Sequence, residues 1–243
     1  MKENQIIGEL VARDYRTASV FKKYSIDFCC QGNRTIEEAC EKKNIDTKKV
    51  LEDLVAMMEA KSESTTDYQS WPLDLLADYI EKKHHRYVQE KTLEIQPYLD
   101  KICKVHGERH PELLEIKEEF NASAGELAAH MKKEEMILFP SIRKMTKAKL
   151  ENTKVDAAHF GTVKNPIQMM MNEHTVEGNR FRKIEELSNN YTPPLDACNT
   201  YRVSFALLKE FEQDLHLHIH LENNILFPRA IEIEKELIQN LNA

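Results

Sequence analysis

Two copies of one short pattern in the sequence contain residue types that bind metals. In each copy a His is followed after three residues by a Glu and, after five more, by a Pro. The copies span 130–140 and 218–228, so matching positions lie 88 residues apart. Residues four apart share one face of a helix, and each copy would therefore direct an imidazole and a carboxylate the same way. Two such helices facing each other would offer two His and two Glu to iron, manganese or zinc.

The alternative interpretation of each His–Glu pair is an ion pair on the surface of a helix, which is the commoner use of this spacing. The flanking residues argue against it, because Phe211 and Leu215 share the face of His218 and Leu127 shares the face of His130. Ionisable groups on an apolar face are costly to bury unless they are paired or bound to a metal. The apolar faces and the repetition therefore favour a metal site.

The composition indicates an all-α protein. The chain of 243 residues contains only 6 Gly and 8 Pro, and its polar and apolar residues alternate with the period of a helix. Four long helical segments are expected between short breaks, at about 72–104, 111–146, 156–188 and 196–237. Long helices with short connections predict an up-down-up-down four-helix bundle. Pro140 and Pro228 are expected to kink or end the second and fourth helices.

The positions of the breaks predict that one His of each helix lies at the same height. In antiparallel neighbours, residues equidistant from the connecting turn are level with each other. The midpoints between successive His of the set fall at 107, 152 and 196, each in or beside a break. The expected layer contains four imidazoles and two carboxylates: His84, His130, His174, His218, Glu134 and Glu222. If both Glu bridge and the His divide two per metal, each of two metals keeps an open position for a small molecule.

Acidic residues near this layer have two interpretations. Glu126 lies four residues before His130, and Asp214 lies four before His218. They could accept hydrogen bonds from imidazole N–H groups or act as extra ligands. The alternative is a solvent-exposed charge at the mouth of the bundle. Glu173 is a weaker candidate of the same kind.

The neighbouring His residues are not expected to bind the metals. On a helix, His216 and His220 point about 160–200° away from His218, and we expect both to be exposed. His85 follows His84 directly and would point sideways from the layer.

Residues 1–60 are expected to form a small domain of short helices, joined by a polar linker over 61–70 to the bundle over 71–243. Cys29 and Cys30 lie in this domain at a turn or helix end, where a helix N-terminus would lower a thiol pKa. Three interpretations of the pair stay open. The thiols could be buried packing groups, a redox pair that supplies electrons to the metals or takes up nitric oxide, or a transient handover site for iron.

Charge and hydropathy argue against several classes of partner. The net charge of −7 argues against nucleic acid, and no run of about 18 apolar residues could form a spanning helix. The N-terminal residues do not resemble a signal peptide, and five irregularly spaced Cys do not form an extracellular disulfide framework. We therefore expect a protein of the reducing cytoplasm that does not associate with a membrane.

Several short motifs follow one another in an order found in a known family. A Tyr, the run Asp-Phe-Cys-Cys and a Gly occur within 24–32, and Gly8-Glu9-Leu10 precedes them. They are followed by Met170–His174, by Pro193-Pro194 and by the run over 222–229. With these motifs the chain resembles, over nearly its whole length, the repair-of-iron-centres proteins of the bacterial nitrosative and oxidative stress response. Gln31 departs from the pattern, since some relatives have a second Gly there.

The resemblance implies a hemerythrin-like bundle that holds two non-haem irons joined by a bridging oxygen. It implies the same six ligands as the layer described above, and it matches Glu126 and Glu173 to acidic positions that line the family's metal channel. The implied role is repair of iron–sulfur clusters damaged by nitric oxide or oxidative stress, by donation of iron. The expected partners are damaged iron–sulfur proteins, with nitric oxide or oxygen as small ligands and a homodimer as one alternative.

Two further functions are weighed beside iron donation. Open positions on adjacent metals favour an enzyme that reduces nitric oxide to nitrous oxide, so whether the protein is an enzyme stays open at this point. By analogy with other hemerythrin-like bundles, the centre could bind or sense oxygen reversibly. That class commonly has a fifth His, for which we find no place in the sequence.

Overall fold

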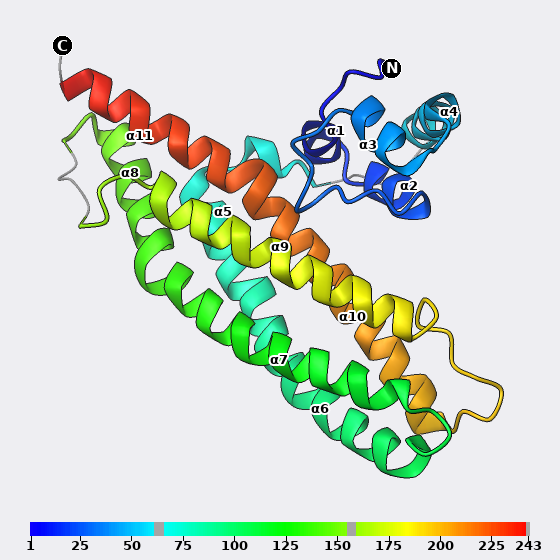
Figure 1. Cartoon of the computed structure of the whole chain (residues 1–243). Coiled ribbons are helices and arrows are strands. Elements are labelled where there is room, and N and C mark those ends of the chain that lie inside the picture. The colour runs from blue at the N-terminus through cyan, green and yellow to red at the C-terminus, as the bar shows by residue number, and fades with distance from the viewer. Residues whose placement is uncertain (61–65, 155–158, 242–243) are drawn as a thin grey trace. The chain divides into compact units, whose positions relative to one another are not determined.

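The computed structural model describes residues 1–60, 66–154 and 159–241 (Figure 1). Within these ranges every regular element is a helix, and a single isolated bridge joins Ile6 to Thr35. The predicted all-α fold class is confirmed. Among the described helices, none has an apolar stretch that would span a bilayer.

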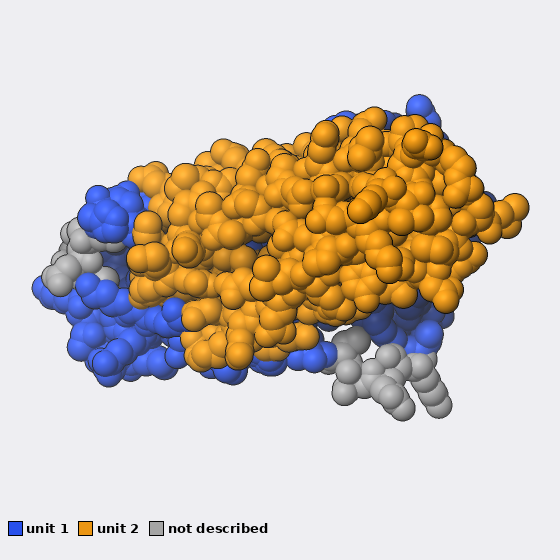
Figure 2. All heavy atoms as spheres, turned by 90° about the horizontal axis from the view of Figure 1, so that it is seen from below, with its two compact units in different colours: residues 1–77, 142–163, 219–243 blue, residues 78–141, 164–218 orange. Residues whose placement is uncertain are grey.

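The chain divides into two compact units, which Figure 2 colours separately. Unit 1 comprises residues 1–77, 142–163 and 219–243, and unit 2 comprises residues 78–141 and 164–218. The boundary after residue 218 falls inside one continuous helical run.

The domain boundaries expected from the sequence are a different division of the chain. A domain over 1–60, a linker over 61–70 and a bundle over 71–243 stay a prediction. Residues 61–65 of the predicted linker lie outside the described residues, and Tyr68–Ser70 form the short 3₁₀ helix η1.

Unit 2 contains four long helical segments, of which the last continues beyond residue 218. Their elements are η2 (Ile80–His85) with α6 (Arg86–His106), α7 (Glu112–Lys133) with η3 (Glu134–Leu138), α9 (Lys164–Leu187) and α10 (Asn199–Leu221). The ring of Phe211 on α10 lies 5.3 Å from that of Phe120 on α7 and 5.4 Å from that of Phe181 on α9. All three rings are buried. Burying each ring stabilises the fold by about 1.5–3 kcal/mol, so this cluster joins three of the four helices.

Breaks between the helices occur where local residues favour them. The helix α6 ends at His106, and α10 begins after the Pro193-Pro194 pair. Asn152 and Asn189 adopt left-handed backbone angles, with φ of 52° and 49°, which Asn tolerates better than most residues. The third helix was expected from about 156, which lies outside the described residues, and α9 is described from Lys164.

The two prolines of the repeated pattern do not end their helices. Helix α8 (Phe139–Glu151) continues through Pro140, and α11 (Phe227–Leu241) continues through Pro228. A wide π-turn precedes each proline, η3 in one case and η4 (Glu222–Leu226) in the other. In η3 the Phe139 N–H donates to the carbonyl of Glu134, and in η4 the Phe227 N–H donates to that of Glu222, five residues earlier in each case. The wide turn accommodates a residue that has no N–H to donate, so the helix continues.

The N-terminal part of unit 1 consists of short helices, two of which have side-chain caps at their N-termini. They are α1 (Ile7–Arg13), α2 (Thr17–Lys23), α3 (Ile36–Lys43) and α4 (Thr47–Glu59), and α5 (Leu73–Tyr79) follows at the end of this part of the unit. Thr35 and Glu38 form a reciprocal capping box, with the Glu38 N–H donating to Thr35 Oγ1 at 3.1 Å and the Thr35 N–H to Glu38 Oε2 at 2.9 Å. Two backbone donors at the start of α3 are thereby satisfied.

Within unit 1, the segment between α2 and α3 packs against η4. Asn223 Nδ2 donates to the carbonyl of Cys29 at 3.1 Å, and Asn224 Nδ2 donates to that of Phe28 at 3.2 Å. Gly8 and Gly32 allow this approach, since the Gly8 N–H bonds to the Gly32 carbonyl at 2.7 Å. A Cβ at Gly8 would meet Asn224 Oδ1 at 2.3 Å. The turn that carries the Cys pair is therefore fixed to the helical run that carries Glu222.

Candidate metal centre

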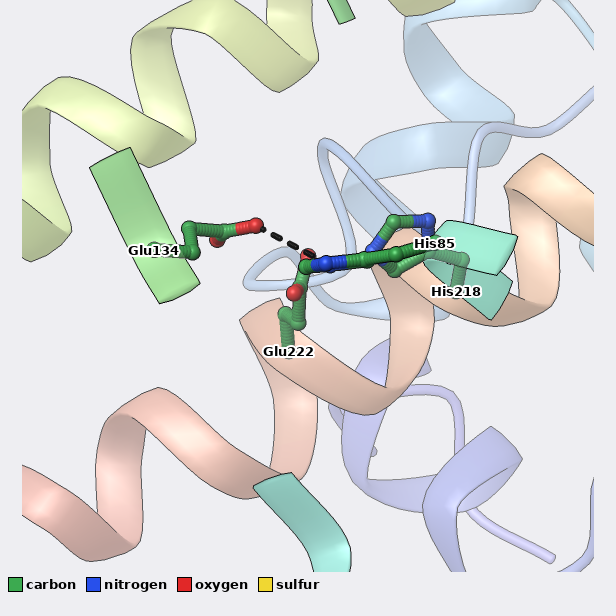
Figure 3. Close-up of side chains that lie close together, drawn as sticks. All are labelled: His85, Glu134, His218 and Glu222. Carbon is green, nitrogen blue, oxygen red and sulfur yellow. Dashed lines mark ion pairs between the residues drawn. The ribbon is translucent and has the colours of Figure 1, made fainter. Parts of the chain in front are cut away.

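Two groups of four buried side chains have geometry suited to metal ions. His85, Glu134, His218 and Glu222 form the group drawn in Figure 3, and His130 and His174 form the second group with the same two Glu. In each group one donor atom per residue lies within 4.8 Å of all the others. Both carboxylates belong to both groups, which is the arrangement of carboxylates that bridge two metals.

The donor atoms come together because the repeated pattern lies on continuous helices. Glu134 follows His130 by one turn where α7 passes into η3, and Glu222 follows His218 by one turn where α10 passes into η4. Glu134 Oε2 lies 3.3 Å from His130 Nε2 and 3.4 Å from His85 Nε2. His130 and His174 face each other with their Nε2 atoms 3.1 Å apart.

In His85 and His130 the ring nitrogen that faces away from the centre is held by a carboxylate. His85 Nδ1 lies 2.8 Å from Glu135 Oε1, and His130 Nδ1 lies 2.7 Å from Glu173 Oε2. A carboxylate on one ring nitrogen fixes the proton there and leaves the lone pair of the other nitrogen for a metal. Together with four imidazoles and two carboxylates that are almost fully buried, this arrangement fits a metal centre.

The structure corrects one of the six residues assigned from the sequence. His85, and not His84, belongs to the group with Glu134 and His218. His84 is also buried, but its Nδ1 lies 3.0 Å from Asp214 Oδ2, and its Nε2 has no hydrogen-bond partner among the described residues. The other five residues, His130, Glu134, His174, His218 and Glu222, are brought together as expected.

The positions of the helix breaks could not distinguish His84 from His85 as the ligand. Neighbouring residues on a helix differ by only about 1.5 Å in height but by about 100° in direction. The midpoints between His residues fix the layer and leave the face undetermined. Both residues also lie in the π-turn η2, where the α-helical register does not apply.

The acidic residues singled out from the sequence have different surroundings. Glu173 contacts His130 and pairs with Lys133. Burial acts to raise the pKa of Glu173, but hydrogen bonds from Lys133 and His130 hold it below its ordinary value. Asp214 contacts His84, while Glu126 is exposed and pairs with Arg180 at 3.1 Å.

Glu135 and Glu177 make contacts in the structure that the sequence pattern did not indicate. Glu135 contacts His85 from another helix, and no spacing along one helix could have indicated that contact. Glu177, one turn after His174, is 3% exposed and accepts a hydrogen bond of 2.5 Å from Ser123 Oγ. Burial raises the pKa of Glu177 despite this bond.

His220 is buried rather than exposed, which corrects a second expectation. Its ring lies 5.5 Å from Tyr15 and 6.2 Å from Phe28, all within unit 1, and burial lowers its pKa to about 3. The helix face opposite His218 is thus covered by N-terminal residues, which helical periodicity alone could not reveal. His216 is half-buried, and neither residue belongs to the two metal-type groups.

The Cys pair lies in a turn between α2 and α3. The backbone N–H groups of Cys29 and Cys30 donate to Asp27 Oδ1 at 3.1 and 2.9 Å, and the two sulfur atoms are 3.8 Å apart. The hydrogen bond with Cys30, burial and the Asp27 carboxylate raise the pKa of Cys29 well above its ordinary value. The expectation of a lowered pKa is therefore wrong for Cys29, because no helix begins there. Asp27, Cys29 and Cys30 form a third group with ligand atoms within 4.8 Å of one another.

Comparison with known proteins adds independent findings. Residues 3–58 match the family model ScdA_N, a domain of unknown function, and residues 76–230 match the hemerythrin HHE cation binding domain. The iron-sulfur cluster repair protein YtfE of Yersinia pestis (strain Pestoides F) is 35% identical over 231 residues, covering 95% of this chain and 98% of that protein. The YtfE protein of Yersinia pseudotuberculosis serotype O:3 (strain YPIII) is 34% identical over the same share of both chains.

Proposed function

Because the chain belongs to the iron–sulfur cluster repair family, with a hemerythrin-type cation-binding domain over 76–230, we propose that it repairs damaged iron–sulfur clusters by donating iron. Damage by nitric oxide or by oxidative stress would produce its clients. The observation that carries this proposal is the pair of buried donor groups that share Glu134 and Glu222.

We propose that the two groups hold two non-haem irons. His85 and His218 would bind one iron, His130 and His174 the other, and both Glu would contact both metals. Imidazole and carboxylate donors suit iron, and bound ferrous iron supplies the metal that a damaged cluster has lost.

The chain's own residues prepare the site for binding and release. Glu135 and Glu173 fix the ring orientation of His85 and His130, so that the Nε2 lone pairs are directed inward. Glu173 also pairs with Lys133, and the hydrogen bonds from Lys133 and His130 lower the pKa of this carboxyl group. The ligands include no thiolate, and an iron held by oxygen and nitrogen donors alone is more readily given to a sulfur-rich acceptor.

The direct test is reactivation of an enzyme whose iron–sulfur cluster has been damaged by nitric oxide. Iron-loaded protein should restore more activity than free ferrous iron at equal concentration. Metal-free protein is the matched control and should restore none. Equal recovery with free iron would contradict donation by the protein.

Reduction of nitric oxide to nitrous oxide is the alternative function. Six protein donors for two irons leave open positions on both, and this count favours a small-molecule reaction. The overall reaction consumes two nitric oxide molecules, two protons and one electron from each ferrous iron, and it yields nitrous oxide and water. Repeated turnover to nitrous oxide under anaerobic conditions with a reductant would support this function, and its absence would leave iron donation.

We further propose that the protein works in the cytoplasm on protein clients rather than on nucleic acid or membranes. All five cysteines are free, which suits a reducing compartment, and the net charge of −7 disfavours nucleic acid. Co-purification with iron–sulfur enzymes after nitric oxide exposure would identify the clients, and size-exclusion chromatography with light scattering would test for a homodimer.

A further inference from the structure

A cysteine outside the metal centre has the surroundings of a reactive thiol. Cys198 is exposed and occupies the N-cap of α10, since the Arg202 N–H makes the first bond of the helix to the Cys198 carbonyl at 3.1 Å. The first backbone N–H groups of a helix have no partner within the helix, and they lie beside the N-cap side chain. These groups carry the partial positive charge of a 23-residue helix and favour the thiolate over the thiol.

A buried imidazole is held against this sulfur. His106 is the last residue of α6 and is only 4% exposed, and its Nε2 lies 3.2 Å from Cys198 Sγ. The rings of His106 and Tyr201 meet edge to face with their centroids 5.4 Å apart, and His106 Nδ1 is buried with no hydrogen-bond partner in the part of the chain that the structure describes. A nucleophile and a base within hydrogen-bond reach of each other are the minimum arrangement for an activated thiol.

The acidic side chain two residues before Cys198 is paired with basic groups. Asp196 precedes Cys198 by two residues, and its carboxylate is bound by Arg109 at 2.8 Å and by His110 at 3.1 Å. Among the five cysteines, Cys198 is the exposed one. Hydrogen bonds from the backbone N–H groups of Tyr201 and Thr200 lower the pKa of Cys198, whereas burial raises that of Cys103.

We propose that Cys198, activated by His106, is a site where this protein forms reversible mixed disulfides with low-molecular-weight disulfides. The thiolate attacks one sulfur of the small disulfide, its S–S bond breaks, and the other sulfur leaves with the electron pair as a thiolate. A new S–S bond joins Cys198 to the small molecule. The proton that Cys198 gave to His106 passes to the leaving thiolate, so one thiol is consumed and one is released.

The expected rate can be stated relative to an ordinary thiol. When a thiol pKa falls by one unit, the thiolate fraction near pH 7 rises about tenfold. The nucleophilicity of the thiolate falls about threefold, so the rate of disulfide exchange rises about threefold. Oxidised glutathione is the probe, added to the full chain near pH 7 and followed by intact mass and peptide mapping. Cys198 should be modified first, and faster than the same residue in the urea-unfolded chain by about threefold for each unit by which its pKa is lowered.

Matched variants test whether the fast modification of Cys198 depends on His106. His106→Gln should slow the modification and shift the pH profile of iodoacetamide alkylation at Cys198 upward, while the backbone N–H groups at the start of α10 keep the rate above that of the unfolded chain. Cys103→Ser removes a cysteine in α6, the helix that carries His106, and should leave the rate at Cys198 unchanged. Modification of Cys198 no faster than in the unfolded chain would overturn the proposal, whether or not the His106 variant folds. An unchanged rate and pH profile in a folded His106→Gln variant would overturn the role of His106.

Discussion

At His85 and His130 the two nitrogens of each ring serve different purposes. The Nδ1 atoms contact Glu135 and Glu173 at 2.8 and 2.7 Å, whereas the Nε2 atoms point to Glu134. The contacts at Nδ1 fix tautomer and orientation, which prepares each ring to bind a metal without rearrangement. His84 has a similar carboxylate contact through Asp214, yet it lies outside both donor groups. A carboxylate partner alone therefore does not identify a ligand.

Exchanging His85 or His84 for Gln distinguishes the two neighbours. His85→Gln should lower the iron content from two per chain to about one, because it removes one of two His from the first proposed metal. His84→Gln should retain both irons. Metal analysis of the two purified variants gives the answer. Full iron in His85→Gln together with loss in His84→Gln would restore the assignment made from the sequence.

Removing a carboxylate that holds an imidazole should weaken the metals without removing a ligand. For Glu173→Gln we expect iron to be lost to a chelator about 10–100 times more readily. Glu126→Gln is the matched control, because Glu126 is exposed and pairs with Arg180 instead of a ligand His. Equal retention by both variants would show that the contact of Glu173 with His130 has no influence on metal binding.

At the scale of the elements, the π-turns η3 and η4 set the direction of the two shared carboxylates. Glu134 and Glu222 are the first residues of η3 and η4, and the carbonyl of each accepts the hydrogen bond that closes its wide turn. Each turn places the carboxylate at the centre while the helix continues past a proline. π-turns are frequent at functional sites because they change side-chain direction within a continuous helix.

The same turns explain how far the sequence could predict the site. Helical period and breaks predicted the four helices and the layer. The 88-residue repeat predicted four of the six residues that the structure brings together, and the positions of the breaks added His174. His85 was missed because η2 changes the register next to it. Glu135 and the covering of His220 were missed because they depend on contacts between segments distant in sequence.

Glycine substitutions test the packing of the Cys-bearing turn on η4. In Gly32→Ala a Cβ would meet the Phe28 carbonyl oxygen at 2.4 Å, so we expect unfolding free energy to fall by about 1–3 kcal/mol. Gly125→Ala is the control, because Gly125 lies in α7 with nothing within 4 Å of the added Cβ, and it should stabilise by about 0.5–1 kcal/mol. Urea unfolding measures both. A neutral Gly32→Ala would mean that neither the Phe28 carbonyl oxygen nor Asn224 Oδ1, which lies 3.0 Å from this Cβ, is held in place.

At the scale of the whole molecule, the metal centre opposes the stability of the bundle unless it is filled. Four imidazoles and two carboxylates are almost completely buried, and buried ionisable groups disfavour folding when they lack a counterpart. The aromatic cluster around Phe211 supplies compensating apolar burial. We therefore expect a metal-free protein that folds and a metal-loaded protein that is clearly more stable.

Removing the metal with a chelator should lower the melting temperature. A ligand present at a hundred times its dissociation constant stabilises by about 2.7 kcal/mol, which corresponds to roughly 5–10 °C for a chain of this size. Calorimetry before and after chelation, and after iron is returned, measures the shift. An identical melting temperature in all three samples would contradict a buried metal centre.

The central claim is that Glu134 and Glu222 are shared by two irons, and iron content in their Ala variants tests it most directly. The wild-type protein should contain two irons per chain. Glu134→Ala and Glu222→Ala should each lose at least one iron while circular dichroism shows intact helices, because packing supplies most of the stability of long helices. Two irons retained in both folded variants would contradict the shared-carboxylate centre.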